Sequence, residues 1–162
     1  MAGARQGWVE AGYIDVPASL SRVLDGAVRV PEQVRDVRIL PGLAQRDKDA
    51  PDVMRGEETQ LLGALASSGA GEALVCMPGT HSKWVTVRDG GVTEFATFMT
   101  GELFDVISKQ TILSHAVADA DAFTGEHAAF TAAVRDIYAT PQLATNRLFT
   151  LRSGQLMHGL TA

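Results

Sequence analysis

Residues 73–99 carry three strand patterns in succession and constrain the fold more than any other part of the chain. Ala73–Met77 is apolar throughout, which predicts a buried strand. Trp84–Arg88 alternates between apolar and polar residues, as a half-buried strand does. Asp89–Gly91 has the composition of a tight hairpin turn, and Val92–Met99 is expected to be the third strand. An antiparallel three-stranded sheet is therefore predicted at the centre of the chain.

Helical patterns surround this sheet. A helix is expected from Thr100 to Ile107, with Leu103, Val106 and Ile107 facing inward. Another is expected from Gly56 to Ala66, where three leucines form an apolar face and two glutamates suit the positive N-terminal end. The flexible segment Ser67–Gly71 predicts a domain boundary. Weaker patterns predict helices at 19–24 (capped by Ser19), 121–138 (with Phe123, Phe130, Val134 and Ile137 at helical spacing) and 141–148, a strand at 37–40, and a polar loop at 44–52.

Composition excludes several classes of protein. The chain has 162 residues, 46% of them hydrophobic, and a net charge of −5 without a basic stripe, so nucleic acid is not an expected partner. The longest apolar stretch, residues 61–77, is interrupted by serine, glycine and glutamate, so no membrane span is expected. A single cysteine, Cys76, fits a reducing cytoplasm, and its apolar neighbours predict a small buried side chain.

The turn that follows the first predicted strand carries groups that bind phosphate. Gly79 allows close approach of the backbone, while backbone amides and the hydroxyls of Thr80 and Ser82 could donate to phosphate oxygens. Lys83 could add a positive charge. A plain hairpin turn explains the same residues equally well. The turn is not a Walker A loop, because a strand rather than a helix follows it.

Two adjacent carboxylates, Glu57 and Glu58, lie at the start of the predicted helix 56–66. They are either solvated groups favoured by the helix dipole or a general base that takes a proton from an attacking hydroxyl. The four histidines have no metal-ligand spacing, so no protein metal site is expected.

Five blocks of the sequence resemble the 2-dehydro-3-deoxygalactonokinases, sugar-acid kinases of the actin-like ATPase superfamily. They occur in the order and near the spacing of that family: Arg5–Trp8, Leu40–Leu43, Asp52–Gln60, Met77–Val85 and Thr97–Phe104. The resemblance implies an α/β, ribonuclease-H-like fold, a cytoplasmic protein, and transfer of the ATP γ-phosphate to the 6-hydroxyl of 2-dehydro-3-deoxy-D-galactonate. The resemblance also implies Mg²⁺, and residues 1–66 and 67–162 as parts of two lobes.

The resemblance also implies roles for individual residues. Gly56–Thr59 resembles the helix start that carries the catalytic base, which points to Glu57, with Glu58 as its rival. Gly79, Thr80 and His81 resemble a turn that holds ATP phosphates, to which Ser82 and Lys83 would contribute. The sugar acid would contact Arg5, Gln6, Trp8, Arg55, Thr100 and Glu102.

The sequence also departs from the family. It lacks the first phosphate loop, of the form Asp-x-Gly-Ser/Thr-x-x-x-Arg, and the glycine-rich adenosine site. We therefore expect a kinase truncated at both ends, with weak or no activity as an isolated chain. The alternative is a non-catalytic remnant, or a fragment that needs a complementing partner chain. Open sheet edges and uncovered apolar faces predict that the isolated chain self-associates.

Overall fold

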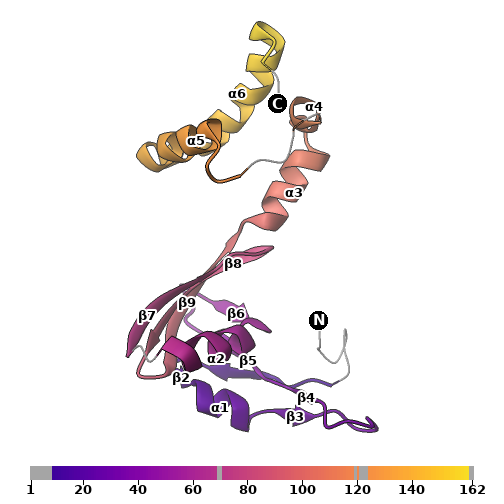
Figure 1. The fold of residues 1–162 in the computed structure, drawn as a ribbon, viewed down its shortest axis with the longest axis vertical. Helices are drawn as coiled ribbons and strands as arrows, with labels where there is room; N and C mark the ends of the chain where they lie inside the picture. Colours follow the sequence, from indigo (N-terminus) through magenta and orange to yellow (C-terminus); the bar gives the residue numbers. More distant parts are fainter. Residues whose placement is uncertain (1–8, 69–70, 119, 121–123, 161–162) are drawn as a thin grey trace. The chain divides into compact units, whose positions relative to one another are not determined.

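The computed structural model describes residues 9–68, 71–118, 120 and 124–160 (Figure 1). The chain divides into two compact units, residues 1–100 and 101–162, each of which is described by itself. The first unit is a mixture of helices and strands, whereas the described part of the second is helical. The α/β class is therefore confirmed. The lobe boundary predicted near residue 67 stays a prediction.

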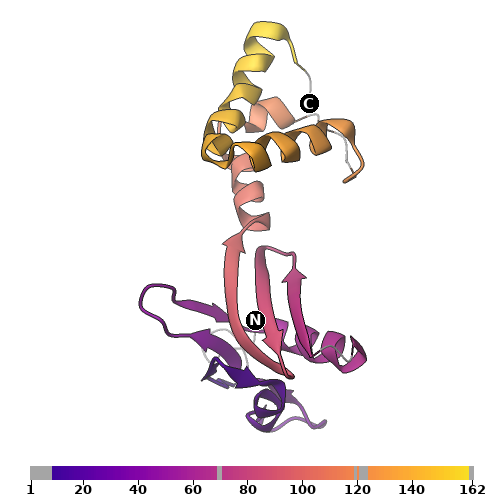
Figure 2. The ribbon, with the colours of Figure 1, turned by 90° about the vertical axis from the view of Figure 1, so that its left-hand side faces the viewer.

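A four-stranded antiparallel sheet forms much of the first unit, with the strand order β2-β9-β8-β7 (Figure 2). Its strands are β2 (Ala18–Ser19), β7 (Glu72–Met77), β8 (His81–Arg88) and β9 (Gly91–Met99). The turn between β8 and β9 places Asp89 and Gly90 at positive φ, as a tight hairpin requires. The predicted three-stranded sheet is confirmed, and β2 extends it.

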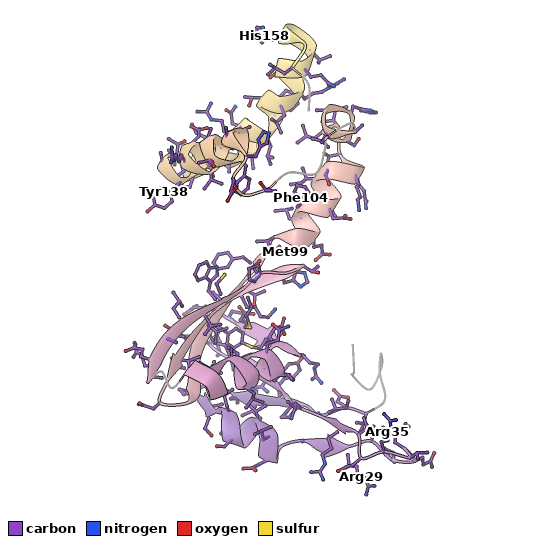
Figure 3. All side chains as sticks on the ribbon, viewed as in Figure 1. Arg29, Arg35, Met99, Phe104, Tyr138 and His158 are labelled. Carbon is purple, nitrogen blue, oxygen red and sulfur yellow. The ribbon has the colours of Figure 1, made fainter. Side chains whose placement is uncertain are left out.

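A second sheet has the order β1-β5-β6, formed by Tyr13–Asp15, Gly42–Gln45 and Asp52–Met54. Strand β5 pairs in parallel with β1 and antiparallel with β6. A separate two-stranded ribbon pairs β3 (Val28–Arg29) with β4 (Arg38–Ile39), and Figure 3 shows Arg29 and Arg35 near its outer end. The predicted loop at 44–52 is wrong at both ends, because Ala44 and Gln45 pair with β6 across a hairpin that also includes Asp52, and β5 pairs with the distant β1.

The core of the first unit lies where both sheets meet two helices, α1 (Leu20–Asp25) and α2 (Glu57–Ser68). Ser19 caps α1 as predicted, accepting a hydrogen bond from the Arg22 amide at 3.3 Å. Leu61 of α2 packs with Val85, Val87 and Phe95 of the four-stranded sheet. Helix α2 therefore covers one face of that sheet and is held there by burial of apolar surface.

The opposite face of the same sheet is open. This open face consists of Leu74, Cys76, Trp84, Ala96 and Phe98, all of them exposed. The prediction of a buried strand and a buried Cys76 is wrong, because β7 is an edge strand whose alternate residues point away from α2.

The second unit contains helices α3 (Gly101–Gln110), α4 (Ser114–Val117), α5 (Ala128–Ala139) and α6 (Ala144–His158), with a 3₁₀ turn at Pro141–Leu143. Leu103 and Val106 are exposed and Ile107 is half-buried, so the predicted inward face of α3 is wrong for the two exposed residues. The predicted helix at 141–148 begins as a 3₁₀ turn and continues as α6 to His158. The predicted helix at 121–138 begins only at Ala128, and Phe123 lies outside the described residues.

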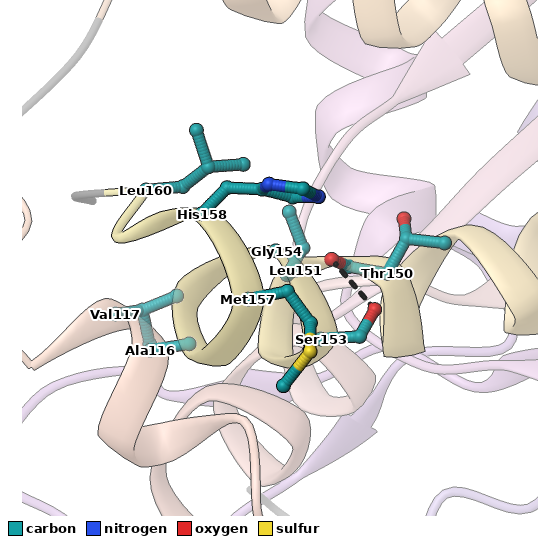
Figure 4. A pocket seen from close by; sticks show the side chains of 9 residues that line it. All are labelled: Ala116, Val117, Thr150, Leu151, Ser153, Gly154, Met157, His158 and Leu160. Carbon is teal, nitrogen blue, oxygen red and sulfur yellow. Dashed lines mark hydrogen bonds between the residues drawn. The ribbon is translucent and has the colours of Figure 1, made fainter.

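Few side chains of the second unit are buried, and Tyr138 projects from α5 with 89% of its surface exposed (Figure 3). A cavity of about 590 Å³ opens between α4 and α6, lined largely by apolar side chains such as Val117, Leu151, Met157 and Leu160 (Figure 4). Its lining includes His158 but no carboxylate. None of the described helices is long and apolar enough to cross a membrane.

Candidate active site

A sharp bend places Glu57 at the start of α2. The chain leaves β6 at the buried Met54 and passes through Gly56 at φ +108°, a conformation that side-chain-bearing residues rarely adopt. Helix α2 then begins at Glu57, so its carboxylate lies at the positive end of the helix dipole. The expected helix start is confirmed to within one residue.

Both carboxylate oxygens of Glu57 have partners. Oε1 lies 2.9 Å from Nζ of Lys83, and Oε2 accepts a hydrogen bond from the Arg55 amide at 3.1 Å. The Glu57 side chain remains 25% exposed, whereas that of Lys83 is only 6% exposed. The carboxylate is thus held from two sides and still reaches the surface.

Glu58 has a different environment. Only 1% of the residue is exposed, and both of its carboxylate oxygens accept from the Gly56 amide, at 2.8 and 2.9 Å. Burial raises the pKa of Glu58 above its ordinary value, although the bond from Gly56 opposes this shift. A carboxylate folded back on its own helix start is poorly placed to reach a bound hydroxyl.

The turn between β7 and β8 is fixed by a network of hydroxyl groups. The Ser82 and Thr100 hydroxyls lie 2.5 Å apart, and the Thr100 hydroxyl also donates to the Gly79 carbonyl at 3.1 Å. The Gly79 amide donates to the Ser82 hydroxyl at 3.4 Å. Ser82 and Thr100 therefore hold the turn in shape, which leaves Gly79 and Thr80 exposed at its tip.

Glu57 and this turn line the same small cavity, of about 200 Å³. Its lining combines the helix start with the end of β7 and the turn: Glu57, Gln60, Met77, Pro78, Gly79, Thr80 and His81. Sequence reasoning selected Glu57, Gly79, Thr80 and His81, and the structure brings these four together. It did not select Gln60, Met77 or Pro78, although Gln60 follows Glu57 at the three-residue spacing that shares a helix face.

Of the other predicted substrate residues, Arg55 does not line this cavity and three are not described. The Arg55 guanidinium donates through Nη2 to the Gly12 carbonyl at 2.9 Å and stacks on Tyr13, with 4.4 Å from Cζ to the ring centre. Among the described residues, its buried Nη1 has no hydrogen-bond partner. Arg5, Gln6 and Trp8 fall outside the described residues. Glu102 lies in the first turn of α3, in the second unit.

Magnesium, which a kinase implies, has no set of protein ligands here. Within the described ranges, no three His, Cys, Asp or Glu side chains are grouped to hold a metal ion. The carboxylates of Glu57 and Glu58 are engaged by Lys83 and by the amides of Arg55 and Gly56. The described residues therefore supply no ligand group for a protein-bound metal.

Comparison with known proteins identifies the class of protein to which this fold and site belong. A family model described as 2-keto-3-deoxy-galactonokinase matches residues 1–162. A Rhizobium meliloti protein named Probable 2-dehydro-3-deoxygalactonokinase DgoK1 is 64% identical over the whole chain, which covers 53% of that relative. The Escherichia coli 2-dehydro-3-deoxygalactonokinase is 39% identical over 128 residues, 76% of this chain and 42% of the relative.

A solved structure agrees with these matches. The crystal structure of a 2-dehydro-3-deoxygalactonokinase-type protein from Sinorhizobium meliloti superposes with a TM-score of 0.94 at 64% identity, over all of this chain and 54% of that one. These relatives are each named as a 2-dehydro-3-deoxygalactonokinase. The chain belongs to the 2-keto-3-deoxy-galactonokinase family, and it spans about half the length of the curated relatives it matches.

Proposed function

We propose that the chain forms part of an actin-like 2-dehydro-3-deoxygalactonokinase, which transfers the ATP γ-phosphate to the 6-hydroxyl of 2-dehydro-3-deoxy-D-galactonate. The observation that carries the proposal is the shared cavity of Glu57 and the turn at Gly79–His81. Phosphoryl transfer requires little of a protein beyond positioning, a base and stabilisation of phosphate charge. The cavity brings together a carboxylate that could act as the base and a turn that could position ATP and stabilise part of the phosphate charge.

In this proposal Glu57 is the general base. The sugar hydroxyl attacks the γ-phosphorus of ATP, its proton passes to a carboxylate oxygen of Glu57, and the bond from phosphorus to the ADP oxygen breaks. Among the described residues, each carboxylate oxygen of Glu57 has one partner and therefore keeps a lone pair for that proton. Glu57 is preferred to Glu58 because it lines the cavity, whereas Glu58 is buried and does not.

The turn receives phosphate oxygens of ATP. No residue in the described part of the chain hydrogen-bonds to the exposed Thr80 hydroxyl, which leaves it available to a phosphate oxygen. The Ser82 and Thr100 hydroxyls act indirectly, because they bind each other and the backbone of the turn. Magnesium would arrive with ATP, and the described residues offer it no ligand set.

In this proposal the chain supplies part of the site, in keeping with its span of about half the length of the relatives. We expect no measurable turnover from the isolated chain, and activity from a full-length chimera in which it replaces the matching segment of the Rhizobium relative. A coupled ADP-release assay with the sugar acid tests both. Turnover of about 10 per second by the isolated chain would contradict the proposal that it holds only part of the active site. An inactive chimera that binds neither ATP nor the sugar acid would favour a non-catalytic remnant.

The same chimera ranks the two glutamates. Glu57→Gln should lower kcat by about a hundredfold to ten-thousandfold, because general-base catalysis contributes that much. Its KM for the sugar acid should change little, since the side chain keeps its size. Glu58→Gln is the matched control and should retain most of the activity. The reverse order would reassign the base to Glu58.

A further inference from the structure

Lys83 is buried, which is unfavourable for a lysine side chain without a partner. It is 5% exposed, and lysine is almost never so deeply buried unless it is paired. Its Nζ lies 2.9 Å from Oε1 of Glu57. A positive charge beside the N-terminus of a helix is opposed by the helix dipole, so Lys83 does not stabilise α2 by its charge. The contact with Glu57 is what offsets the cost of this placement.

The sheet explains how Lys83 reaches Glu57. Along β8, alternate residues share a face, so Lys83 points to the same side as the buried Val85 and Val87. Helix α2 covers that side, and its first residue lies over the end of the row. The same strand begins at His81, directly after the exposed tip of the turn. Lys83 therefore joins the proposed base to the proposed phosphate turn through one short segment of β8.

We propose that Lys83 is a positioning residue that fixes the Glu57 carboxylate toward the cavity, rather than a ligand of the ATP phosphates. Together with the Arg55 amide, it holds both oxygens of Glu57 and so limits rotation of the carboxylate. The described cavity lining includes Glu57 and the turn but not Lys83, whose Nζ is paired with Glu57. The effect of Lys83 on catalysis rests on the proposed kinase function, whereas its effect on the orientation of Glu57 rests on the ion pair alone.

A purely structural role predicts a different outcome from a positioning role. Lys83→Met removes one partner of the ion pair, which destabilises a protein when the other charge is left buried and unpaired. Glu57 remains 25% exposed, keeps the Arg55 amide and lies at a helix N-terminus. Lys83→Met should therefore still fold, with a reduced free energy of unfolding, and lose catalysis. Since small misplacements of reacting groups cost about a hundredfold in rate, we expect kcat of the chimera to fall by about tenfold to a hundredfold. The KM for ATP should stay within about twofold, since no contact to phosphate is lost.

The decisive experiment is chemical rescue in the chimera. Lys83→Ala should be reactivated by propylammonium, which restores the cation, but not by 1-propanol, which has a similar shape without charge. Lys48→Met, in the exposed loop between β5 and β6, is the matched control and should behave like the parent protein. A rise in the KM for ATP, equal rescue by the alcohol, or unchanged kcat would each overturn the positioning role.

A second readout separates this inference from the proposed function. The ¹³C carboxyl resonance of Glu57 in this chain, assigned by its loss in Glu57→Gln, should shift in Lys83→Met and stay unchanged in Lys48→Met. An unmoved resonance would overturn the ion pair whether or not the chimera is active. A shifted resonance with an inactive chimera would leave the ion pair supported and the kinase function refuted.

Discussion

The Asp52 carboxylate binds both donors of Thr97: Oδ2 accepts from the Thr97 amide at 2.7 Å and Oδ1 from its hydroxyl at 2.8 Å. Asp52 is the first residue of β6, and Thr97 lies in β9 of the other sheet. Gln45 makes a similar link, since its Oε1 accepts from the Phe95 amide at 3.3 Å. Asp52 and Gln45 of the three-stranded sheet thus accept hydrogen bonds from β9 amides of the four-stranded sheet. These amides lie beyond Gly91 and Val92, the two residues of β9 that pair with β2.

The first prediction concerns this link. Asp52→Ala should lower the free energy of unfolding by about 1–3 kcal/mol, because the part-buried Thr97 amide loses its acceptor. Asp49→Ala, in the neighbouring exposed loop, is the matched control and should change stability by less than about 0.5 kcal/mol. Urea unfolding followed by circular dichroism measures both. Equal midpoints for the two variants would show that the link does not stabilise the fold.

The link also shows where sequence reasoning succeeds and where it stops. Strands β8 and β9 were predictable because alternation and the Asp89–Gly91 turn are local signals. Strand β5 was not, because its parallel partner β1 lies far away in the sequence and neither strand exceeds four residues. Cys76 was misplaced because an apolar run does not reveal that one face of its sheet is uncovered, as the exposed Trp84 beside it shows.

The site divides in the same way. Glu57 and the turn at Gly79–His81 were predictable, because a helix start and a glycine turn carry local chemistry and the family resemblance orders them. The pairing of Glu57 with Lys83 was not, since it depends on which face of β8 meets α2. The burial of Glu58 was not either, because adjacent residues at a helix start look equivalent until the packing of the helix is known.

A second prediction concerns Gly42, where β5 passes between its neighbours. A Cβ there would overlap the Met54 carbonyl and come within 2.6 Å of the Tyr13 ring. Gly42→Ala should therefore destabilise the chain by about 1–3 kcal/mol through overpacking. Gly63→Ala in α2 is the matched control, because a Cβ there meets nothing within 4 Å. It should stabilise by about 0.5–1 kcal/mol, and thermal melts that rank the two variants in the opposite order would contradict the packing.

A third prediction concerns pH. Burial raises the pKa of Glu58 above its ordinary value of 4.5. Between that value and the raised one, the folded state holds a proton that the unfolded state has released, so stability falls as pH rises through this window. Glu58→Gln lacks this titration, and its amide oxygen still accepts from Gly56. Its stability relative to the parent chain should therefore increase as pH rises above about 4.5.

Melting temperatures of the two proteins, measured from pH 4 to pH 8, test this prediction. Glu10→Gln, at an exposed position, controls for the general effect of removing one negative charge. A parent chain that gains stability over Glu58→Gln as pH rises would mean that hydrogen bonding outweighs burial and that the pKa is lowered.

The last prediction concerns the open face of the four-stranded sheet. Leu74, Trp84 and Phe98 are 65%, 45% and 54% exposed. Strand β7, which carries Leu74, is an edge strand of the sheet. Exposed apolar patches and free edges favour association, so the isolated chain should form concentration-dependent oligomers. The double variant Leu74→Glu/Phe98→Lys should shift sedimentation toward the monomer. Leu24→Glu, a single exposed leucine on α1, should not. A parent chain that sediments as a monomer at every concentration would show that the open face does not bind a second copy.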